Sequence, residues 1–162
     1  MAWVFELAAE CGPERFAAHQ FAEFFRGQSW YLTDELLSQC STNVHQDGEG
    51  NWWSCVLPSG LSRSGIHDDI DAILMTEAGR RLYERLRIAP PFRYALVGVE
   101  SDDFRAFSEL DDDLVTLAFD GLVIAEEIWT SLDRPAVFVP FKPGYFWRPY
   151  KGEIYGKRSA KL

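Results

Sequence analysis

The chain has 162 residues, of which 47% are apolar and 15% aromatic, a composition typical of a globular domain and unlike that of a disordered chain. Its net charge of −9 argues against a reader of duplex DNA or RNA, because phosphate contacts normally require a basic face. No apolar run approaches the roughly 20 residues needed to cross a bilayer, and the start Met-Ala-Trp-Val-Phe-Glu lacks the pattern of a signal peptide. We therefore expect a cytoplasmic protein without a membrane or duplex nucleic-acid partner.

Charged residues are unevenly distributed along the chain. All four lysines fall in residues 142–162, where six bases face one acid, Glu153, whereas residues 1–141 have a net charge of −14. We expect a single domain over residues 1–162, with 142–162 as an aromatic and basic C-terminal extension. The extension either solubilises the chain, folds back on the acidic body or docks an acidic partner.

Strand and helix patterns alternate in the first part of the chain. A strand is expected over residues 3–7, followed by a helix that Gly12-Pro13 opens and Gly27 ends. Thr33, followed by two acidic residues, predicts the cap of a second short helix. A hairpin is expected over residues 40–57, because residues 47–51 have the composition of a turn.

Residues 66–88 allow two interpretations. The isoleucines and Leu74 fit the apolar stripe of one helix, but the run 70–75 also fits a short strand that ends at Thr76. We favour the second interpretation, in which Thr76 caps a helix over residues 77–87 and Pro90-Pro91 follows its end.

The clearest strand is expected over residues 92–100, which are apolar on both faces and therefore belong in the middle of a sheet. A helical turn capped by Ser101-Asp102 and an acidic loop at residues 111–113 follow it. The remaining expected elements are strands at 114–119, 122–125 and 136–141 and a helix at 126–132, with Pro140 favouring a sheet edge. The fold class is α+β, or mixed α/β, with a single mixed sheet of about five strands and helices packed on it.

The three cysteines, Cys11, Cys40 and Cys55, have no metal-site spacing, so we expect reduced, buried thiols. Cys40 and Cys55 would face each other if the hairpin aligned them. The chain contains no phosphate-binding loop and no dinucleotide fingerprint, and we predict no cofactor and no metal. The run from Gly60 to Gly65 misses the nucleophile-elbow pattern, because Ser64 stands where that pattern requires glycine. No catalytic residue is therefore predicted.

Aromatic residues stand out where large rings are adjacent. Alternation along a strand would send neighbouring rings to opposite faces. These rings either fill the core and cover the second face of the sheet, or form a protein-binding surface, because Trp, Tyr and Arg are frequent interface anchors. The candidate residues for it are Trp52, Trp53, Trp147, Arg148 and Tyr150.

Three hypotheses for function follow. The leading one is a non-enzymatic binding or regulatory module whose acidic body selects a basic protein, as a toxin-neutralising immunity protein does. The first alternative is a small enzyme or small-molecule-binding protein with a site assembled from separated residues such as Cys55, His67 and Asp69. The second alternative is a structural protein that self-associates as a homodimer through its aromatic patch.

Overall fold

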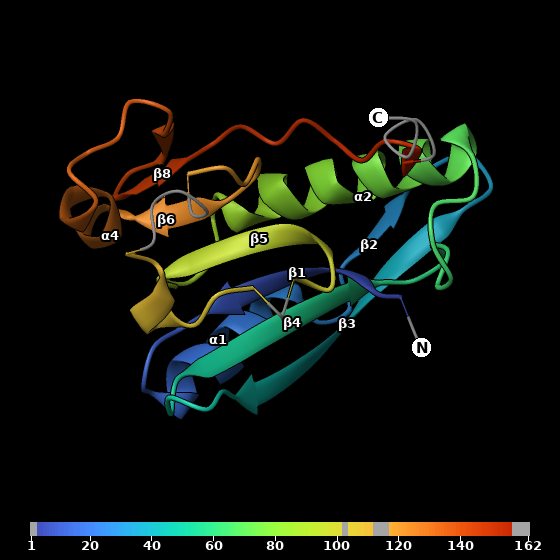
Figure 1. The fold of residues 1–162 in the computed structure, drawn as a ribbon. Coiled ribbons are helices and arrows are strands. Elements are labelled where there is room, and N and C mark those ends of the chain that lie inside the picture. Colours follow the sequence, from blue (N-terminus) through green and yellow to red (C-terminus); the bar gives the residue numbers. More distant parts are fainter. Residues whose placement is uncertain (1–2, 102–103, 112–116, 157–162) are drawn as a thin grey trace.

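An eight-stranded sheet forms the centre of the molecule (Figure 1). The computed structural model describes residues 3–101, 104–111 and 117–156. The strands are β1 (Phe5–Glu10), β2 (Ser29–Tyr31), β3 (Leu37–Gln46), β4 (Trp52–Pro58), β5 (Tyr94–Val99), β6 (Val123–Ala125), β7 (Val139–Lys142) and β8 (Tyr145–Trp147). Their order in the sheet is β2-β3-β4-β1-β5-β6-β8-β7, and neighbouring strands are antiparallel.

The α+β class is confirmed, but the expectation of a mixed sheet of about five strands is wrong. Strands β2, β6 and β8 have only three residues each, which is too short for a period-two pattern to be recognised. β8 also lies within the expected C-terminal extension. It pairs with both β6 and β7, so at least residues 145–147 belong to the sheet.

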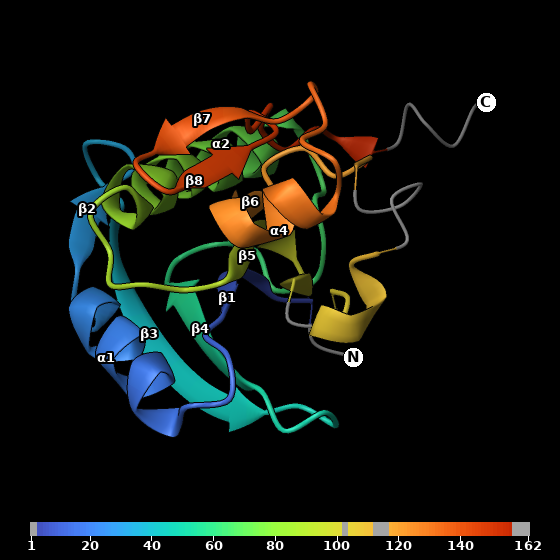
Figure 2. The same ribbon diagram turned by 90° about the vertical axis from the view of Figure 1, so that its left-hand side faces the viewer.

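Three helices and one helical turn complete the described part of the chain. The helices are α1 (Arg15–Phe25), α2 (Asp69–Leu86) and α4 (Glu126–Ser131), and the 3₁₀ turn is η2 (Phe107–Glu109). Figure 2 shows α1 and α2 on one side of the curved sheet and the gold η2 on the other. No helix within the described residues is both long and apolar enough to span a membrane.

The sheet has a hydrophobic core on each face. Alternation along β1 sends Leu7 to the core beneath α1 and α2, while Ala8 enters the core beneath η2 and α4. The expected central strand is confirmed as β5, which lies between β1 and β6 with both of its faces covered. The expected hairpin is β3–β4, and Pro140 lies in the edge strand β7, as predicted.

The preferred interpretation of residues 66–88 is wrong, because one helix runs from Asp69 to Leu86. Asp68 is its N-cap and accepts a hydrogen bond from the Asp71 backbone N–H at 2.9 Å. Thr76 lies inside the helix and donates to the Ala72 carbonyl. Ile70 and Ile73, which were expected on the apolar stripe of a helix, are each 65% exposed, and the buried face of α2 includes the small residues Ala72, Ala78 and Gly79.

Three other local predictions are corrected. Residues 32–36 form the turn between β2 and β3 instead of a helix, and Thr33 Oγ1 accepts hydrogen bonds from the backbone N–H groups of Glu35 and Leu36. The capping interaction is thus present in a turn that no helix follows. Ser101 Oγ donates to the Glu6 and Gly98 carbonyls, so it does not cap η2. Residues 102 and 114–116 lie outside the described residues, and residues 117–119 are not in a strand.

Candidate protein-binding surfaces

The two adjacent tryptophans of β4 lie on opposite faces of the sheet. Trp53 is 3% exposed, its indole N–H donates to Asp47 Oδ2 at 2.9 Å, and its ring meets Tyr94 edge-on at 5.4 Å. Trp52 is half-buried, with the guanidinium of Arg15 over its ring at 5.3 Å. Trp53 therefore offers no surface to a partner, whereas Trp52 keeps part of its surface accessible.

The C-terminal candidates lie elsewhere. Trp147 and Tyr150 are half-buried, and their rings lie 5.1 Å and 4.9 Å from that of the buried Tyr83 on α2. Arg148 is paired with Asp120, with 2.8 Å between Nη2 and Oδ1. Three strands separate β4 from β8, so the five candidate residues do not form one surface.

The residues suggested for an enzyme site are also separated. His67 and Asp69 are exposed at the beginning of α2, where Nε2 of His67 lies 2.8 Å from Ser64 Oγ. Cys55 is buried on the face of the sheet opposite α2. Within the described residues, no group of three or more His, Cys, Asp or Glu side chains could hold a metal ion.

All three cysteines are buried, as expected, and none of them is in a disulfide. Burial raises the pKa values of the Cys11 and Cys40 thiols to about 12, so both are protonated at neutral pH and are poor nucleophiles. In the β3–β4 register, Cys40 is opposite Pro58 and Cys55 is opposite Asn43, so these two cysteines do not face each other.

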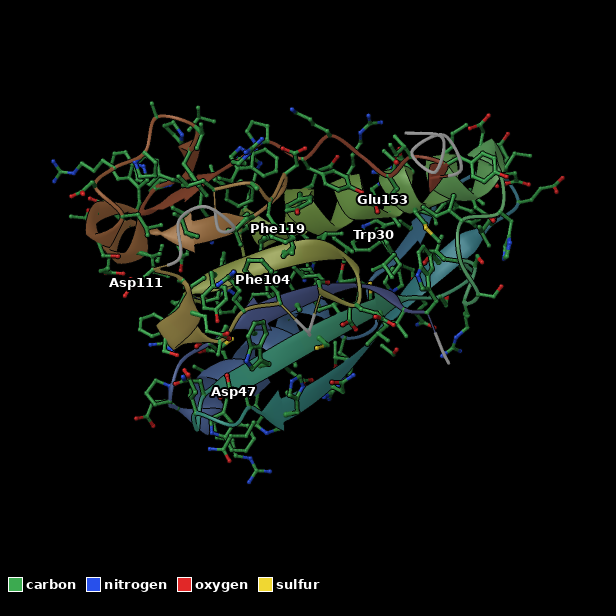
Figure 3. The ribbon with its side chains drawn as sticks, viewed as in Figure 1. Trp30, Asp47, Phe104, Asp111, Phe119 and Glu153 are labelled. Atoms are coloured by element: carbon green, nitrogen blue, oxygen red, sulfur yellow. The ribbon has the colours of Figure 1, made fainter. Side chains whose placement is uncertain are left out.

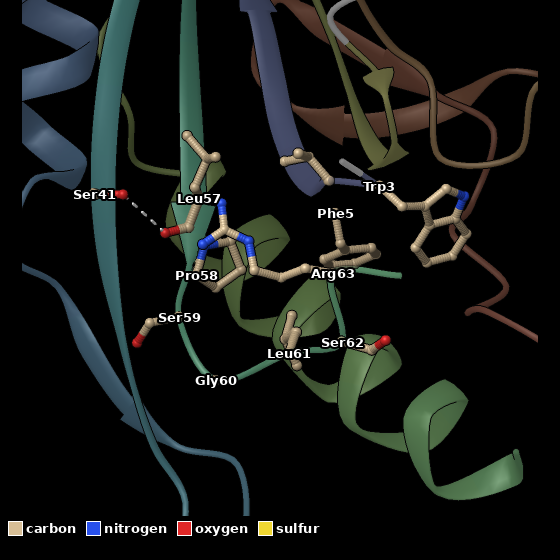
Figure 4. A pocket seen from close by; sticks show the side chains of 11 residues that line it. Trp3, Phe5, Ser41, Leu57, Pro58, Ser59, Gly60, Leu61, Ser62 and Arg63 are labelled. Atoms are coloured by element: carbon tan, nitrogen blue, oxygen red, sulfur yellow. Dashed lines mark hydrogen bonds between the residues drawn. The ribbon is translucent and has the colours of Figure 1, made fainter. Parts of the chain in front are cut away.

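A small cavity of about 180 Å³ lies at the end of β4 beside the loop that holds Ser62 (Figure 4). Ser62 Oγ donates to the Gly65 carbonyl at 2.6 Å, and the Arg63 side chain extends toward Pro58. The described residues that line the cavity include no histidine and no carboxylate to act as a general base for Ser62. The cavity thus lacks the groups that serine-based hydrolysis needs.

An acidic surface lies beside the core beneath η2 and α4, which it contacts through Asp47 and Phe119. We call it the acidic ridge and define it by six residues from the β3–β4 turn, η2 and the segment that follows: Asp47, Glu49, Phe107, Glu109, Asp111 and Phe119. Figure 3 shows Asp47 near the β3–β4 turn, Asp111 at the left of the molecule and Phe119 nearer its centre, next to Phe104. Glu49 joins the turn to η2, because its carboxylate accepts hydrogen bonds from the backbone N–H and the hydroxyl of Ser108.

The ridge has a rigid base. The carboxylate of Glu10, fully buried in β1, forms a two-point ion pair with Arg93 and also accepts the Gly12 N–H at 2.7 Å. The guanidinium of Arg93 lies 3.6 Å from the ring centre of Phe107 and makes a cation–π contact with this ring. The ring of Phe119 packs edge-on against Phe104 at 4.8 Å. Both ridge rings are therefore held in place without a partner.

Asp47 is held in its charged form. Partial burial acts to raise its pKa, but the Trp53 indole and the backbone N–H groups of Asn51 and Glu49 donate to its carboxylate, and the net effect lowers the pKa. The ridge therefore keeps this negative charge to lower pH than an ordinary aspartate would.

Comparisons with protein-family models, curated proteins and solved structures find no match for this chain. The geometry must therefore carry the functional argument. The interpretation of residues 111–113 as an acidic loop does not predict the ridge. A usable signal was present, since residues 100–113 contain seven acidic residues and one base, Arg105.

Proposed function

We propose that this chain is a non-enzymatic protein-binding module and that its acidic ridge receives a basic protein. The observation that supports this most directly is the combination of Phe107 and Phe119, 38% and 37% exposed, with the carboxylates of the ridge. Aromatic anchors within a polar rim are the usual pattern of a specific interface. A ring that is already fixed loses little conformational entropy when a partner binds.

Charge supports a basic partner. The chain has a net charge of −9, and Glu49, Glu109 and Asp111 on the ridge are exposed. Complementary potentials accelerate encounter and disfavour acidic competitors. A toxin-neutralising immunity protein is one kind of protein that works in this way. Capture of the partner should weaken as ionic strength rises, because exposed charges are screened over about 8 Å at physiological salt.

Two matched charge reversals test the proposal. Asp111 on the ridge and Glu14 beside α1 are both exposed, and neither side chain makes a hydrogen bond or ion pair within the described residues. We expect the wild type to capture a basic protein from the native cell, identified by mass spectrometry. With that purified partner, Asp111→Lys should weaken binding about tenfold and Glu14→Lys should leave it nearly unchanged. Equal losses in both variants, or no captured partner, would contradict the proposal.

Self-association is a second candidate, favoured by large exposed apolar side chains. Phe16 on α1 is 75% exposed and Ile88 after α2 is 70% exposed. Phe16 borders a hollow that His19, Gln20, Glu23, Phe24 and Pro90 also line. A dimer that buries Phe16 and this hollow should dissociate in the variant Phe16→Glu. Light scattering that reports a monomer for the wild type at every concentration would exclude it.

A further inference from the structure

A groove between α2 and the C-terminal segment has the opposite character to the ridge. Its volume is about 260 Å³, and it is lined by Arg80, Tyr83, Glu84, Arg87, Trp147 and Tyr150. Arg80 and Arg87 are two helical turns apart, about 10 Å along the helix at 1.5 Å per residue. They therefore stand at the two ends of the groove, with the aromatic rings between them.

The rings of Tyr83, Trp147 and Tyr150 form the aromatic floor of the groove, and contacts within the fold hold them in place. The hydroxyl of Tyr83 donates to the Gly121 carbonyl at 2.6 Å and accepts the Val97 N–H at 3.2 Å. Trp147 and Tyr150 pack on this ring, and the hydroxyl of Tyr150 donates to Glu153 at 2.9 Å. Trp147 and Tyr150 remain half-buried, so the floor presents ring surface that no described side chain covers completely.

Arg80 also borders a second hollow, which Glu77 and Glu153 line, but it is not in ion-pair contact with either of these described residues. Within the described residues, neither Arg80 nor Arg87 forms an ion pair. Arg87 donates to the Phe141 carbonyl and lies over the Phe141 ring at 4.2 Å, so its positive charge is held in place but not neutralised by a carboxylate. Glu84, the acid that lines the groove, has its carboxylate 4.0 Å from Arg81.

We propose that this groove binds an acidic segment of a protein, with carboxylates on Arg80 and Arg87 and an apolar side chain on Trp147 and Tyr150. Guanidinium groups favour carboxylates because they can donate two parallel hydrogen bonds. The groove is smaller than the roughly 300–1,000 Å³ sites that enclose most free small ligands, but it accommodates one large side chain. This site goes beyond the proposed function and does not depend on it, because its charge is opposite to that of the ridge.

The test measures binding of a fluorescent peptide, Glu-Glu-Phe-Glu-Glu, to the full chain by anisotropy. Arg80→Glu should weaken binding of this peptide about tenfold, because one exposed cation becomes an anion. The matched control is Arg63→Glu, since Arg63 is also exposed and forms no ion pair within the described residues. It should bind like the wild type. Replacing the peptide phenylalanine by alanine should also weaken binding.

Three results would overturn the proposal. The first is that the acidic peptide does not bind to the wild type. The second is that Arg80→Glu and Arg63→Glu weaken its binding equally. The third is that the wild type binds Lys-Lys-Phe-Lys-Lys as tightly as the acidic peptide. A second variant, Trp147→Leu, tests the contribution of the aromatic rings by themselves, because it keeps both arginines. If circular dichroism shows that it is folded, it should bind the acidic peptide more weakly than the wild type, and unchanged affinity would contradict a role for the floor.

Discussion

Gly79 and Tyr150 provide a stability test in which two effects of opposite sign compete. Gly79 lies inside α2, where alanine would ordinarily stabilise the helix by about 1 kcal/mol. A Cβ atom added at Gly79 would lie 2.5 Å from Tyr150 Oη and 2.8 Å from Tyr150 Cζ. The variant Gly79→Ala must therefore displace the Tyr150 ring.

The displacement should outweigh the gain in helix propensity. The ring would lose its packing on Tyr83 at 4.9 Å and its hydrogen bond to Glu153 at 2.9 Å. Overpacking of this kind costs about 1–3 kcal/mol, and the hydrogen bond contributes about 1 kcal/mol. After the helix gain of about 1 kcal/mol is subtracted, we expect Gly79→Ala to destabilise the protein by about 1–3 kcal/mol.

The same substitution should change sign in a Tyr150→Ala background. Without the ring there is no overlap, so Gly79→Ala should then stabilise the chain by about 0.5–1 kcal/mol. Urea unfolding followed by circular dichroism measures each free energy of unfolding, provided that the slope with denaturant stays constant. Equal effects of Gly79→Ala in both backgrounds would show that Tyr150 does not rest on Gly79.

Three further predictions use the same unfolding assay. Truncation after Phe141 should abolish cooperative unfolding, because it removes β8 from between β6 and β7, and a sharp transition would show that this segment is an appendage. Arg93→Met should cost about 3–5 kcal/mol by leaving the buried Glu10 carboxylate without its cation, and a loss under about 1 kcal/mol would refute this. Burial raises the pKa of Glu153 above its ordinary value of 4.5, although the Tyr150 hydroxyl acts to lower it. The stability that Glu153 contributes is therefore complete below pH 4.5 and lost as pH rises through the raised value, so Glu153→Gln should flatten this pH dependence. An unchanged profile would contradict it.

The success of each fold prediction followed the strength of its local signal. The helix before Gly27 and the β3–β4 hairpin combine a clear period with turn residues at their ends, and both are confirmed. The N-terminal half of α2 was predicted as a strand because Thr76 and Glu77 have the residue types of a helix start. That local signal did not decide the boundary, since the helix already begins at Asp69 and is held by the packing of residues such as Met75 and Leu82.

Whether a candidate residue is accessible to a partner depends more strongly on tertiary contacts than the secondary structure does. Alternation along β4 predicted that Trp52 and Trp53 point to opposite faces, but it could not predict which ring would be covered. Trp53 is covered because the β3–β4 turn supplies Asp47 to its indole and β5 supplies Tyr94 to its ring.

The sequence by itself determined the acidic character of the chain, the α+β class and the elements whose period and end signals agree. Only the tertiary structure decided that residues 145–147 are an inner strand, that Tyr150 rests on a glycine of α2 and that Phe107 lies over Arg93. The physical reason is that these side chains are placed by groups far away in the chain. Strand pairing, ring packing and ion pairing across such separations leave no periodic signal in the residues themselves.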